Sequence, residues 1–247
     1  MMQLYPAIDI RGGKCVRLRQ GNYNDETIFA DDPVEMALRW KNEGAEWLHL
    51  VDLDGAREGR PVNHEIVKRI VSETGLPCQM GGGIRDEDNI RMAIEDIGLT
   101  RVIIGTKALK EPQWFADACG KFPNYLALGL DAKDSMVATE GWLEVSQVSV
   151  MELAKQFLQV PISAVIYTNI ANDGMMQGID QATLADLRAL AEMGLPVIAS
   201  GGVTTMDDIH ALQKTAADVP GLIGAIVGRA IYEGTISVPE ACETLRA

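Results

Sequence analysis

The 247-residue sequence is short of positive charge and has no long apolar run. Lys and Arg number 22 against 35 Asp and Glu, a net charge of −13, which argues against nucleic acid or an anionic membrane surface as partner. A small anionic substrate is compatible with this charge, since glycine-rich loops and a few arginines can hold a phosphate. No apolar run reaches the length of a membrane span, and no signal-peptide pattern precedes the first strand-like run. We therefore expect a cytoplasmic protein.

The sequence also lacks paired cysteines and linkers. Its four cysteines are scattered without a C-x-x-C pair or metal-ligand spacing, at Cys15, Cys78, Cys119 and Cys242. This pattern predicts neither a disulfide framework nor a metal site, and it is typical of a reducing compartment. No Pro/Ser-rich or low-complexity segment divides the chain, so we expect one domain covering residues 1–247.

Short apolar runs alternate with amphipathic stretches along the whole chain. Strands are predicted near residues 4–9, 46–52, 76–80, 101–104, 125–131, 163–168, 196–200 and 222–227. Helices are predicted near 33–43, 62–72, 86–97, 111–119, 149–158, 180–191, 206–214 and 237–245. Eight such units in a chain of this length favour a closed (β/α)8 TIM barrel of the α/β class. An open doubly wound sheet would need a helix after Gly12-Gly13, where a β-like run follows instead.

The sequence repeats itself with a period of about 120 residues. The matched segments are Asp9 with Asp131, Asp54-Gly55 with Asp173-Gly174, Gly81-Gly82-Gly83-Ile84 with Ser200-Gly201-Gly202-Val203, and Ile103-Ile104-Gly105-Thr106 with Ile226-Val227-Gly228-Arg229. The matches keep the same order in both halves. We therefore predict two half-barrels, at about residues 1–122 and 123–247.

Asp9 and Asp131 are the candidate catalytic residues. Each ends an apolar run, and strands one and five of an eight-stranded barrel lie across its mouth from one another, at the end where barrel enzymes keep their chemistry. The alternative is that each aspartate only caps a turn, a place that Asp favours. A symmetric pair at this end of the barrel favours the catalytic interpretation.

Paired glycine loops are the candidate phosphate sites. Glycine lets backbone N–H groups approach an anion closely. One loop cluster contains Gly82, Gly83, Gly105 and Thr106, and the other contains Gly201, Gly202, Gly228 and Arg229. A single glycine pair is usually just a tight turn, but two clusters at equivalent positions predict a substrate with a phosphate at each end.

Several motifs together resemble one family of histidine biosynthesis, the phosphoribosylformimino-aminoimidazole carboxamide ribotide isomerases. The motifs are Pro6-Ala7-Ile8-Asp9-Ile10, Val16-Arg17-Leu18-Arg19-Gln20-Gly21, Val51-Asp52-Leu53-Asp54-Gly55-Ala56, Gly81-Gly82-Gly83-Ile84-Arg85 and Gly105-Thr106. The resemblance implies an Amadori rearrangement of an aminoaldose ribotide, with a phosphate at each end, into an aminoketose. It implies Asp131 as the acid that opens the ribose ring and Asp9 as the base at the adjacent carbon. This proton transfer requires no metal, nicotinamide or flavin.

The resemblance extends to further residues. It implies that loops 12–22 and 137–146 fold over the substrate. In these loops Arg19 would reach a phosphate and Trp142 would stack on the aminoimidazole. Thr168 and Asp173 would contact the substrate or steady Asp131. The chain departs from the family at two positions: Asn169 stands where an acid is usual, and Met175 where threonine is usual.

The three histidines and Asp52 complete the expectations. His49 is expected in the packed core and Asp52 as an inward residue of the barrel mouth, whereas His64 and His210 lie on helix patterns and are expected at solvated faces.

Two other functions compete with the isomerase. The related cyclase subunit would have cysteine two residues before the first aspartate, where this chain has Ala7, and Asp-Gly in place of Gly12-Gly13. A non-catalytic phosphate-binding barrel would gain nothing from two carboxylates in an anion pocket. Isomerisation of phosphoribosyl anthranilate as a second substrate stays open. We expect a monomer whose partner is the bis-phosphate ribotide, with no nucleic acid and no membrane.

Overall fold

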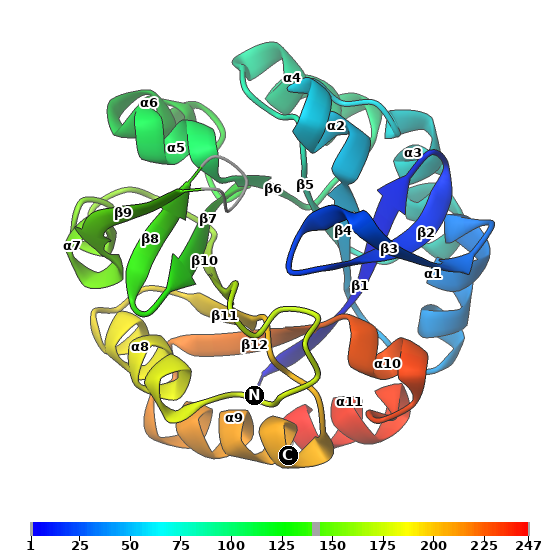
Figure 1. Cartoon of the computed structure of the whole chain (residues 1–247). Coiled ribbons are helices and arrows are strands. Elements are labelled where there is room, and N and C mark those ends of the chain that lie inside the picture. Colours follow the sequence, from blue (N-terminus) through cyan, green and yellow to red (C-terminus); the bar gives the residue numbers. More distant parts are fainter. Residues whose placement is uncertain (1, 140–143, 247) are drawn as a thin grey trace.

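Eight parallel strands form a closed barrel in the computed structural model, which describes residues 2–139 and 144–246. The barrel strands are β1 (Gln3–Arg11), β4 (Leu48–Asp52), β5 (Cys78–Gly81), β6 (Arg101–Ile104), β7 (Leu126–Lys133), β10 (Ala164–Asn169), β11 (Val197–Ser200) and β12 (Leu222–Val227). They are hydrogen-bonded in this order, and the pairing of β12 with β1 closes the ring (Figure 1). The predicted (β/α)8 barrel is confirmed.

Helices cover the outside of the barrel where the apolar periodicity predicted them. They are α1 (Pro33–Asn42), α3 (His64–Thr74), α4 (Glu87–Arg91) continued by the π-helical turn η1 (Met92–Asp96), α6 (Pro112–Lys121), α7 (Val150–Lys155), α8 (Gln181–Glu192), α9 (Met206–Asp218) and α11 (Val238–Arg246). Three short helices have no counterpart in the prediction: α2 (Leu53–Glu58), α5 (Thr106–Lys110) and α10 (Arg229–Glu233). They are too short to show an apolar period. The termini of the described chain are joined by a hydrogen bond from Met2 N to Leu245 O of 2.9 Å.

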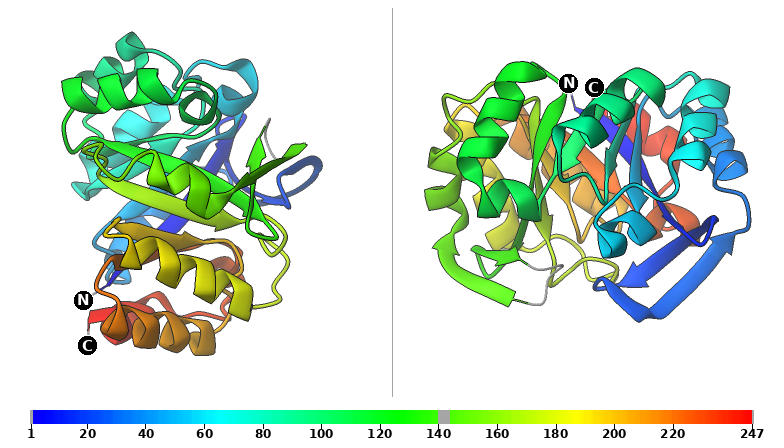
Figure 2. Two further views of the ribbon diagram at one scale, coloured as in Figure 1. Left: turned by 90° about the vertical axis from the view of Figure 1, so that its left-hand side faces the viewer. Right: turned by 90° about the horizontal axis from the view of Figure 1, so that it is seen from above.

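Two β-hairpins project from one end of the barrel, opposite the chain termini (Figure 2). The first consists of β2 (Lys14–Arg19) and β3 (Asn22–Ala30), and the second of β8 (Met136–Thr139) and β9 (Glu144–Ser149). Both segments were expected as loops, with a β-like run only after Gly12-Gly13. That run is confirmed as β2, and the expectation of loops was wrong in that most of the described residues of both segments are strands. β1 and β7 run past the barrel, and their free backbone groups there pair with the antiparallel return strands β2 and β8.

The same close backbone contact occurs in both halves of the barrel. A side chain at Gly82, where φ is +112°, would place its Cβ 2.2 Å from the carbonyl oxygen of Asp52. At Gly201, where φ is +79°, the equivalent Cβ would lie 2.5 Å from the carbonyl oxygen of Asn169. Glycine is therefore needed at both positions for packing against the preceding strand.

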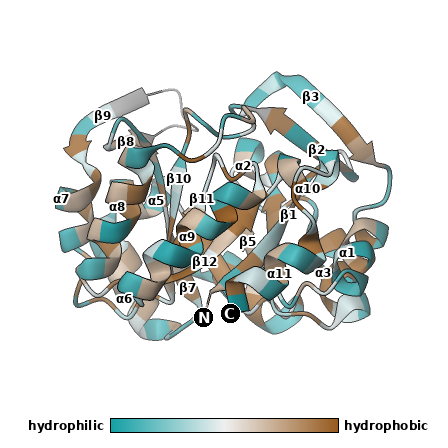
Figure 3. Cartoon of the chain, turned by 90° about the horizontal axis from the view of Figure 1, so that it is seen from below, coloured by the Kyte–Doolittle hydropathy of each residue, from teal (hydrophilic) through white to brown (hydrophobic). Residues whose placement is uncertain are grey.

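The core has one layer inside the barrel and another between the sheet and the helices. The inner layer contains Tyr5, Ala7, Ala127, Ala164, Ile166, Ile198 and Ile226. The outer layer is larger and includes Leu48 and Leu50 of β4. Apolar residues accordingly concentrate on the strands and on the inner faces of the helices, with polar residues outside (Figure 3). No helix among the described residues is both long and apolar enough to cross a membrane.

Asp52 ends β4, but its side chain faces outward to α2 and not into the barrel mouth, so the expectation of an inward residue was wrong. Its side chain is fully buried and caps α2. Oδ1 accepts hydrogen bonds from Gly55 N (2.8 Å) and Asn63 Nδ2 (2.7 Å), and Oδ2 accepts from Val62 N (2.7 Å) and Asn63 N (2.9 Å). Through these hydrogen bonds the Asp52 carboxylate holds the segment that follows β4 in place.

Replacement of Asp52 by Asn should destabilise the protein strongly. The amide NH2 group would face donors that now bind a carboxylate oxygen, so the free energy of unfolding should fall by about 2–4 kcal/mol. Urea denaturation followed by circular dichroism measures this change. The exposed Glu243→Gln is the matched control and should stay within about 0.5 kcal/mol of the wild type. Equal stabilities for the two variants would contradict the role given to Asp52.

Candidate active site

A pocket of about 1050 Å³ occupies the barrel mouth between the two hairpins and is lined by residues from all eight barrel strands. It contains nearly all residues that the sequence analysis singled out: Asp9, Asp131, Gly82, Gly83, Gly105, Thr106, Thr168, Asp173, Gly201, Gly202, Gly228 and Arg229. Trp142 and the side chain of Arg19 lie outside the part of the chain that the structure describes.

Asp9 and Asp131 lie on opposite walls of this pocket. Asp9 is on β1 and Asp131 on β7, and three barrel strands separate these two strands in either direction around the sheet. Thr168 of β10 is in direct register with Asp131. A substrate held across the mouth would therefore have one carboxyl group on each side.

Arg17 of β2 was not among the predicted site residues, yet it forms an ion pair with Asp9. Arg17 Nη1 lies 2.8 Å from Asp9 Oδ1, and the two side chains are only 10% and 13% exposed. Burial raises the pKa of Asp9 to about 6, with the Arg17 charge opposing this rise and the Asp173 charge adding to it. Asp9 therefore takes up its proton at a pH well above that of an ordinary aspartate, which makes it a candidate general base.

Gly228 makes room for this arginine. A Cβ atom at position 228 would lie 1.9 Å from Nη2 of Arg17, so the guanidinium group rests directly on the glycine. Arg17 Nε is buried and has no hydrogen-bond partner among the described residues. The sequence analysis assigned Gly228 to a phosphate-binding loop. In the structure a glycine at this position is also needed for the packing of Arg17.

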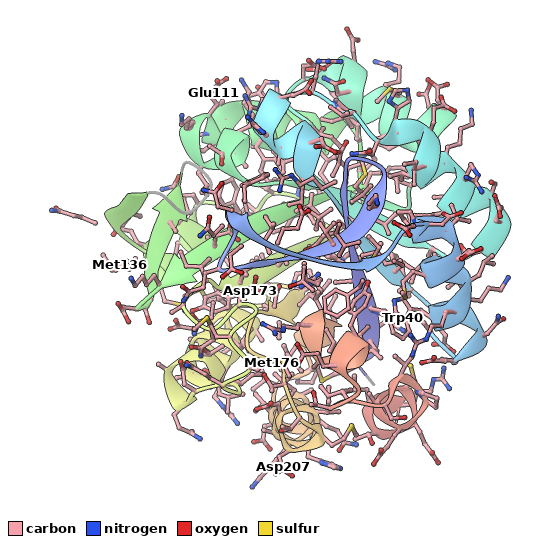
Figure 4. The ribbon with its side chains drawn as sticks, turned by 45° about the vertical axis from the view of Figure 1, so that its right-hand side comes forward. Trp40, Glu111, Met136, Asp173, Met176 and Asp207 are labelled. Carbon is pink, nitrogen blue, oxygen red and sulfur yellow. The ribbon has the colours of Figure 1, made fainter. Side chains whose placement is uncertain are left out.

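The loop after β10 brings a second acidic residue to the pocket. Asp173 is half-buried, and its partial loss of solvent raises its pKa, while the nearby Arg17 charge lowers it. Figure 4 shows Asp173 nearer the middle of the molecule than the peripheral Met136 and Asp207. Arg229 Nη1 holds this loop by donating to Gly174 O (3.1 Å), and Gln20 Nε2 of the β2–β3 turn donates to Ala171 O (2.9 Å).

The two departures from the family pattern fit the local structure. Asn169 Nδ2 donates to Thr183 Oγ1 (2.7 Å) and to Asp180 Oδ2 (3.2 Å). An acid at position 169 would instead face the Asp180 carboxylate, so the amide avoids a repulsion between like charges. Met175 does not line the pocket, although its neighbours Gly174 and Met176 do.

Cations line the pocket beside the glycines of both halves. Arg57, Arg85 and Lys107 line it together with the glycines of the first half, whereas Arg229 lines it with those of the second half, where Arg17 also rests on Gly228. The first three cations were not predicted as site residues. Arg85 and Lys107 follow the glycine motifs directly in the chain, which is the signal that could have found them.

His49 lines the pocket and is not part of the sealed core, so that expectation was wrong. It alternates with Leu48 and Leu50 along β4 and therefore faces the barrel interior. His210 is exposed and His64 half-buried, as their helix positions indicated. Among the described residues, no cluster of three or more His, Cys, Asp or Glu side chains could hold a metal ion.

Comparison with known proteins relates this chain to one group of enzymes. The model of the histidine biosynthesis protein family matches residues 3–237. A curated 1-(5-phosphoribosyl)-5-((5-phosphoribosylamino)methylideneamino) imidazole-4-carboxamide isomerase from Hahella chejuensis is 57% identical over 242 residues, 97% of each chain. Isomerases of the same name from Marinobacter nauticus and Cellvibrio japonicus are each 54% identical, over 99% and 97% of this chain and 100% and 97% of their own.

The pH dependence of catalysis should report the ion pair between Arg17 and Asp9. The substrate for this test is the ribotide that the curated relatives isomerise. Asp9 takes up a proton below about pH 6, and a base must be ionised to act, so kcat/KM should fall as the pH drops below that value. Because Arg17 lowers the pKa of Asp9, the substitution Arg17→Met should raise that pKa and move the acid limb of the profile to higher pH.

The control for this profile is Lys14→Met, which removes an exposed cation from the same strand. Its acid limb should coincide with that of the wild type. Titration of the substrate phosphates affects all three proteins alike, so only the difference between profiles counts. An unshifted limb in Arg17→Met would exclude Asp9 as the titrating base.

Proposed function

The chain belongs to the histidine biosynthesis protein family, and on that premise we propose that Asp9 and Asp131 catalyse its reaction as a base and an acid. The reaction is that of its relatives, an aldose–ketose isomerisation in histidine biosynthesis. In this Amadori rearrangement an aminoaldose ribotide with a phosphate at each end becomes an aminoketose. The observation that carries the proposal is the placement of the two carboxyl groups on opposite walls of one pocket.

Ring opening is the first step of the proposed mechanism. Asp131 donates a proton to the ribose ring oxygen, and the bond between this oxygen and carbon 1 breaks. The lone pair of the glycosidic nitrogen forms the C=N bond of a protonated Schiff base. The positive nitrogen then makes the hydrogen on carbon 2 acidic.

Proton transfer between neighbouring carbons follows. Asp9 takes the proton from carbon 2, a C=C bond forms, and the nitrogen recovers its lone pair to give an enolamine. Asp9 then returns its proton to carbon 1, while Asp131 recovers one from the hydroxyl group on carbon 2, which becomes the ketone. Both carboxyl groups end as they began, and no atom is gained or lost.

The titration of Asp9 supports its assignment as the base. Its pKa of about 6 leaves it ionised at neutral pH but basic enough to accept a proton from carbon. Arg17 stabilises the ionised form through the ion pair. Thr168 is placed in register beside Asp131, where it can orient the acid, and Asp173 is placed beside Arg17.

We propose that the two glycine clusters bind the two phosphates. Gly82, Gly83, Gly105 and Thr106 would hold one, and Gly201, Gly202, Gly228 and Arg229 the other. Their location at opposite sides of the pocket, each with at least one cation, supports this assignment. Arg19 and Trp142 would close over the substrate, as the family resemblance implies.

We further propose that the enzyme is a single domain of two half-barrels, residues 1–122 and 123–247, and acts as a monomer in the cytoplasm. The equivalent contacts of Gly82 and Gly201 support the repeat. Both aspartates and both glycine clusters come from one chain, so a monomer would hold the whole proposed site. The four free cysteines, all buried, are consistent with a reducing compartment. Light scattering on the purified protein would measure its mass in solution.

Asp9→Asn and Asp131→Asn should each lower kcat by a factor of at least about 10² to 10⁴, because an amide can neither accept nor supply the proton. Chromatographic assay of ketose formation from the aminoaldose ribotide, without added cofactor, measures the loss. Calorimetric titration with the same ribotide should show nearly unchanged affinity in both variants.

The exposed Asp117→Asn on α6 is the control and should keep wild-type turnover. Near-wild-type turnover in either active-site variant would refute the paired acid–base mechanism. Parallel assays with phosphoribosyl anthranilate, and for the cyclase reaction with ammonia, define the substrate range. Activity only in the cyclase assay would overturn the isomerase assignment itself.

A further inference from the structure

A row of three polar side chains crosses the inside of the barrel beneath the pocket. His49 of β4, Gln79 of β5 and Arg101 of β6 are direct neighbours in the strand register. Gln79 Nε2 lies 3.1 Å from His49 Nδ1, and Arg101 Nη1 lies 2.7 Å from Gln79 Oε1. Gln79 is fully buried and Arg101 nearly so, while His49 lines the pocket. The mechanism above does not use any of these three residues.

The row determines which nitrogen of His49 carries the proton. Arginine can only donate hydrogen bonds, so the atom of Gln79 that faces Arg101 must be its amide oxygen. The amide nitrogen of Gln79 therefore faces His49, and it too can only donate. Nδ1 of His49 is then the acceptor, and in the neutral ring the proton resides on Nε2.

Arg101 is itself held firmly, so the direction of this row is fixed. Its Nε donates to Ser163 Oγ (3.1 Å), which in turn donates to Leu126 O (2.8 Å). Its guanidinium carbon lies 5.0 Å from the centre of the Trp47 ring. Reversal of the Gln79 amide would bring its NH2 group against a cation that cannot move away.

The ring of His49 is neutral and has a free donor. Burial lowers its pKa to about 3, and the Arg17 charge lowers it further in the same direction. Among the described residues, Nε2 has no hydrogen-bond partner and is not sealed from the pocket. A neutral donor can stabilise negative charge that develops on an oxygen without surrendering its own proton.

We propose that the neutral Nε2–H group of His49 donates a hydrogen bond to the oxygen on carbon 2 of the sugar, where the ketone forms. Asp9, the proposed base, acts on carbon 2 itself. His49 is in register with Ala7, which precedes Asp9 by two residues on the same inward face of β1. The imidazole therefore lies below Asp9, about 7 Å along the strand direction, on the floor of the pocket.

This inference rests on the proposed isomerase mechanism and adds a third catalytic residue to it. Electron density shifts to the carbon-2 oxygen as the enolamine becomes the ketone, and the hydrogen bond is strongest at that stage. His49 keeps its proton throughout, so the proton balance between Asp9 and Asp131 is unchanged. Gln79 and Arg101 are positioning residues that select the productive tautomer.

Kinetics of two His49 variants test the proposal. His49→Leu removes the donor and should lower kcat by about 10² to 10³ with little change in KM, as loss of one transition-state donor does. His49→Gln keeps an N–H group near the position of Nε2 and should retain most of the activity that leucine loses. His210→Gln, an exposed change of the same kind, is the control. Near-wild-type kcat in a folded His49→Leu protein would overturn the proposal.

Nuclear magnetic resonance of the wild-type protein provides a test that does not depend on a His49 variant folding. The chain has only three histidines, and the ¹⁵N-labelled His64→Gln and His210→Gln proteins, each changed on an outer helix, identify the signals of the other two and so leave those of His49. At neutral pH we expect one neutral tautomer with the proton on Nε2 and a change in the Nε2 signal when the ketose product binds. A proton on Nδ1, or a charged ring, would overturn the proposal.

The outcomes separate this inference from the function on which it rests. Loss of activity in Asp9→Asn with full activity in His49→Leu would leave the acid–base pair intact and remove His49 from the mechanism. A wild-type protein that is inactive on the ribotide would remove the proposed function, whichever tautomer His49 adopts.

Discussion

Hydrogen bonding between β12 and β1 closes the sheet into a ring, and the pocket depends on this closure. In an open sheet, β1 and β7 would lie in one row with three strands between them, and their aspartates could not face each other. In the closed ring they occupy opposite walls, with three strands between them on either side. Since all eight barrel strands are parallel, their carboxyl ends, both hairpins and the glycine loops meet at the same end of the molecule (Figure 2).

The ion pair between Arg17 and Asp9 shows how this fold places charge in a buried position. Two half-buried carboxyl groups, Asp9 and Asp173, both lie close enough to Arg17 for its charge to lower their pKa values. Burial alone would favour the protonated acid by raising the pKa of each carboxyl group. The guanidinium group of Arg17 lowers both pKa values and so favours the ionised form. The hairpin that carries Arg17 therefore does more than cover the mouth, because it adjusts the titration of the base. Gly228 is the packing requirement that permits this arrangement.

Much of the fold was predictable from local pattern. Every barrel strand and every long helix appears where apolar runs and helical periodicity indicated, because each such segment must bury an apolar face. The internal repeat added the pairing of Asp9 with Asp131. The sequence showed a β-like run at the position of β2, but the hairpins were not predicted, because their strands pair with extensions of β1 and β7, which no local pattern reveals. His49 and Asp52 were misplaced because both faces of a parallel barrel strand are apolar, so the sequence does not show which face is inward.

By itself, the sequence determined the order of the elements, the barrel class, the two candidate catalytic aspartates and the glycines of the mouth. These follow from local propensity, from chain length and from repetition, which can all be read along one chain. Only the tertiary structure decided that Arg17 pairs with Asp9, that Arg57, Arg85 and Lys107 gather at one end of the pocket, and that His49, Gln79 and Arg101 form a row. Burial and strand register set these relations, because the pKa of a carboxyl group and the tautomer of a histidine depend on neighbours that are distant in sequence.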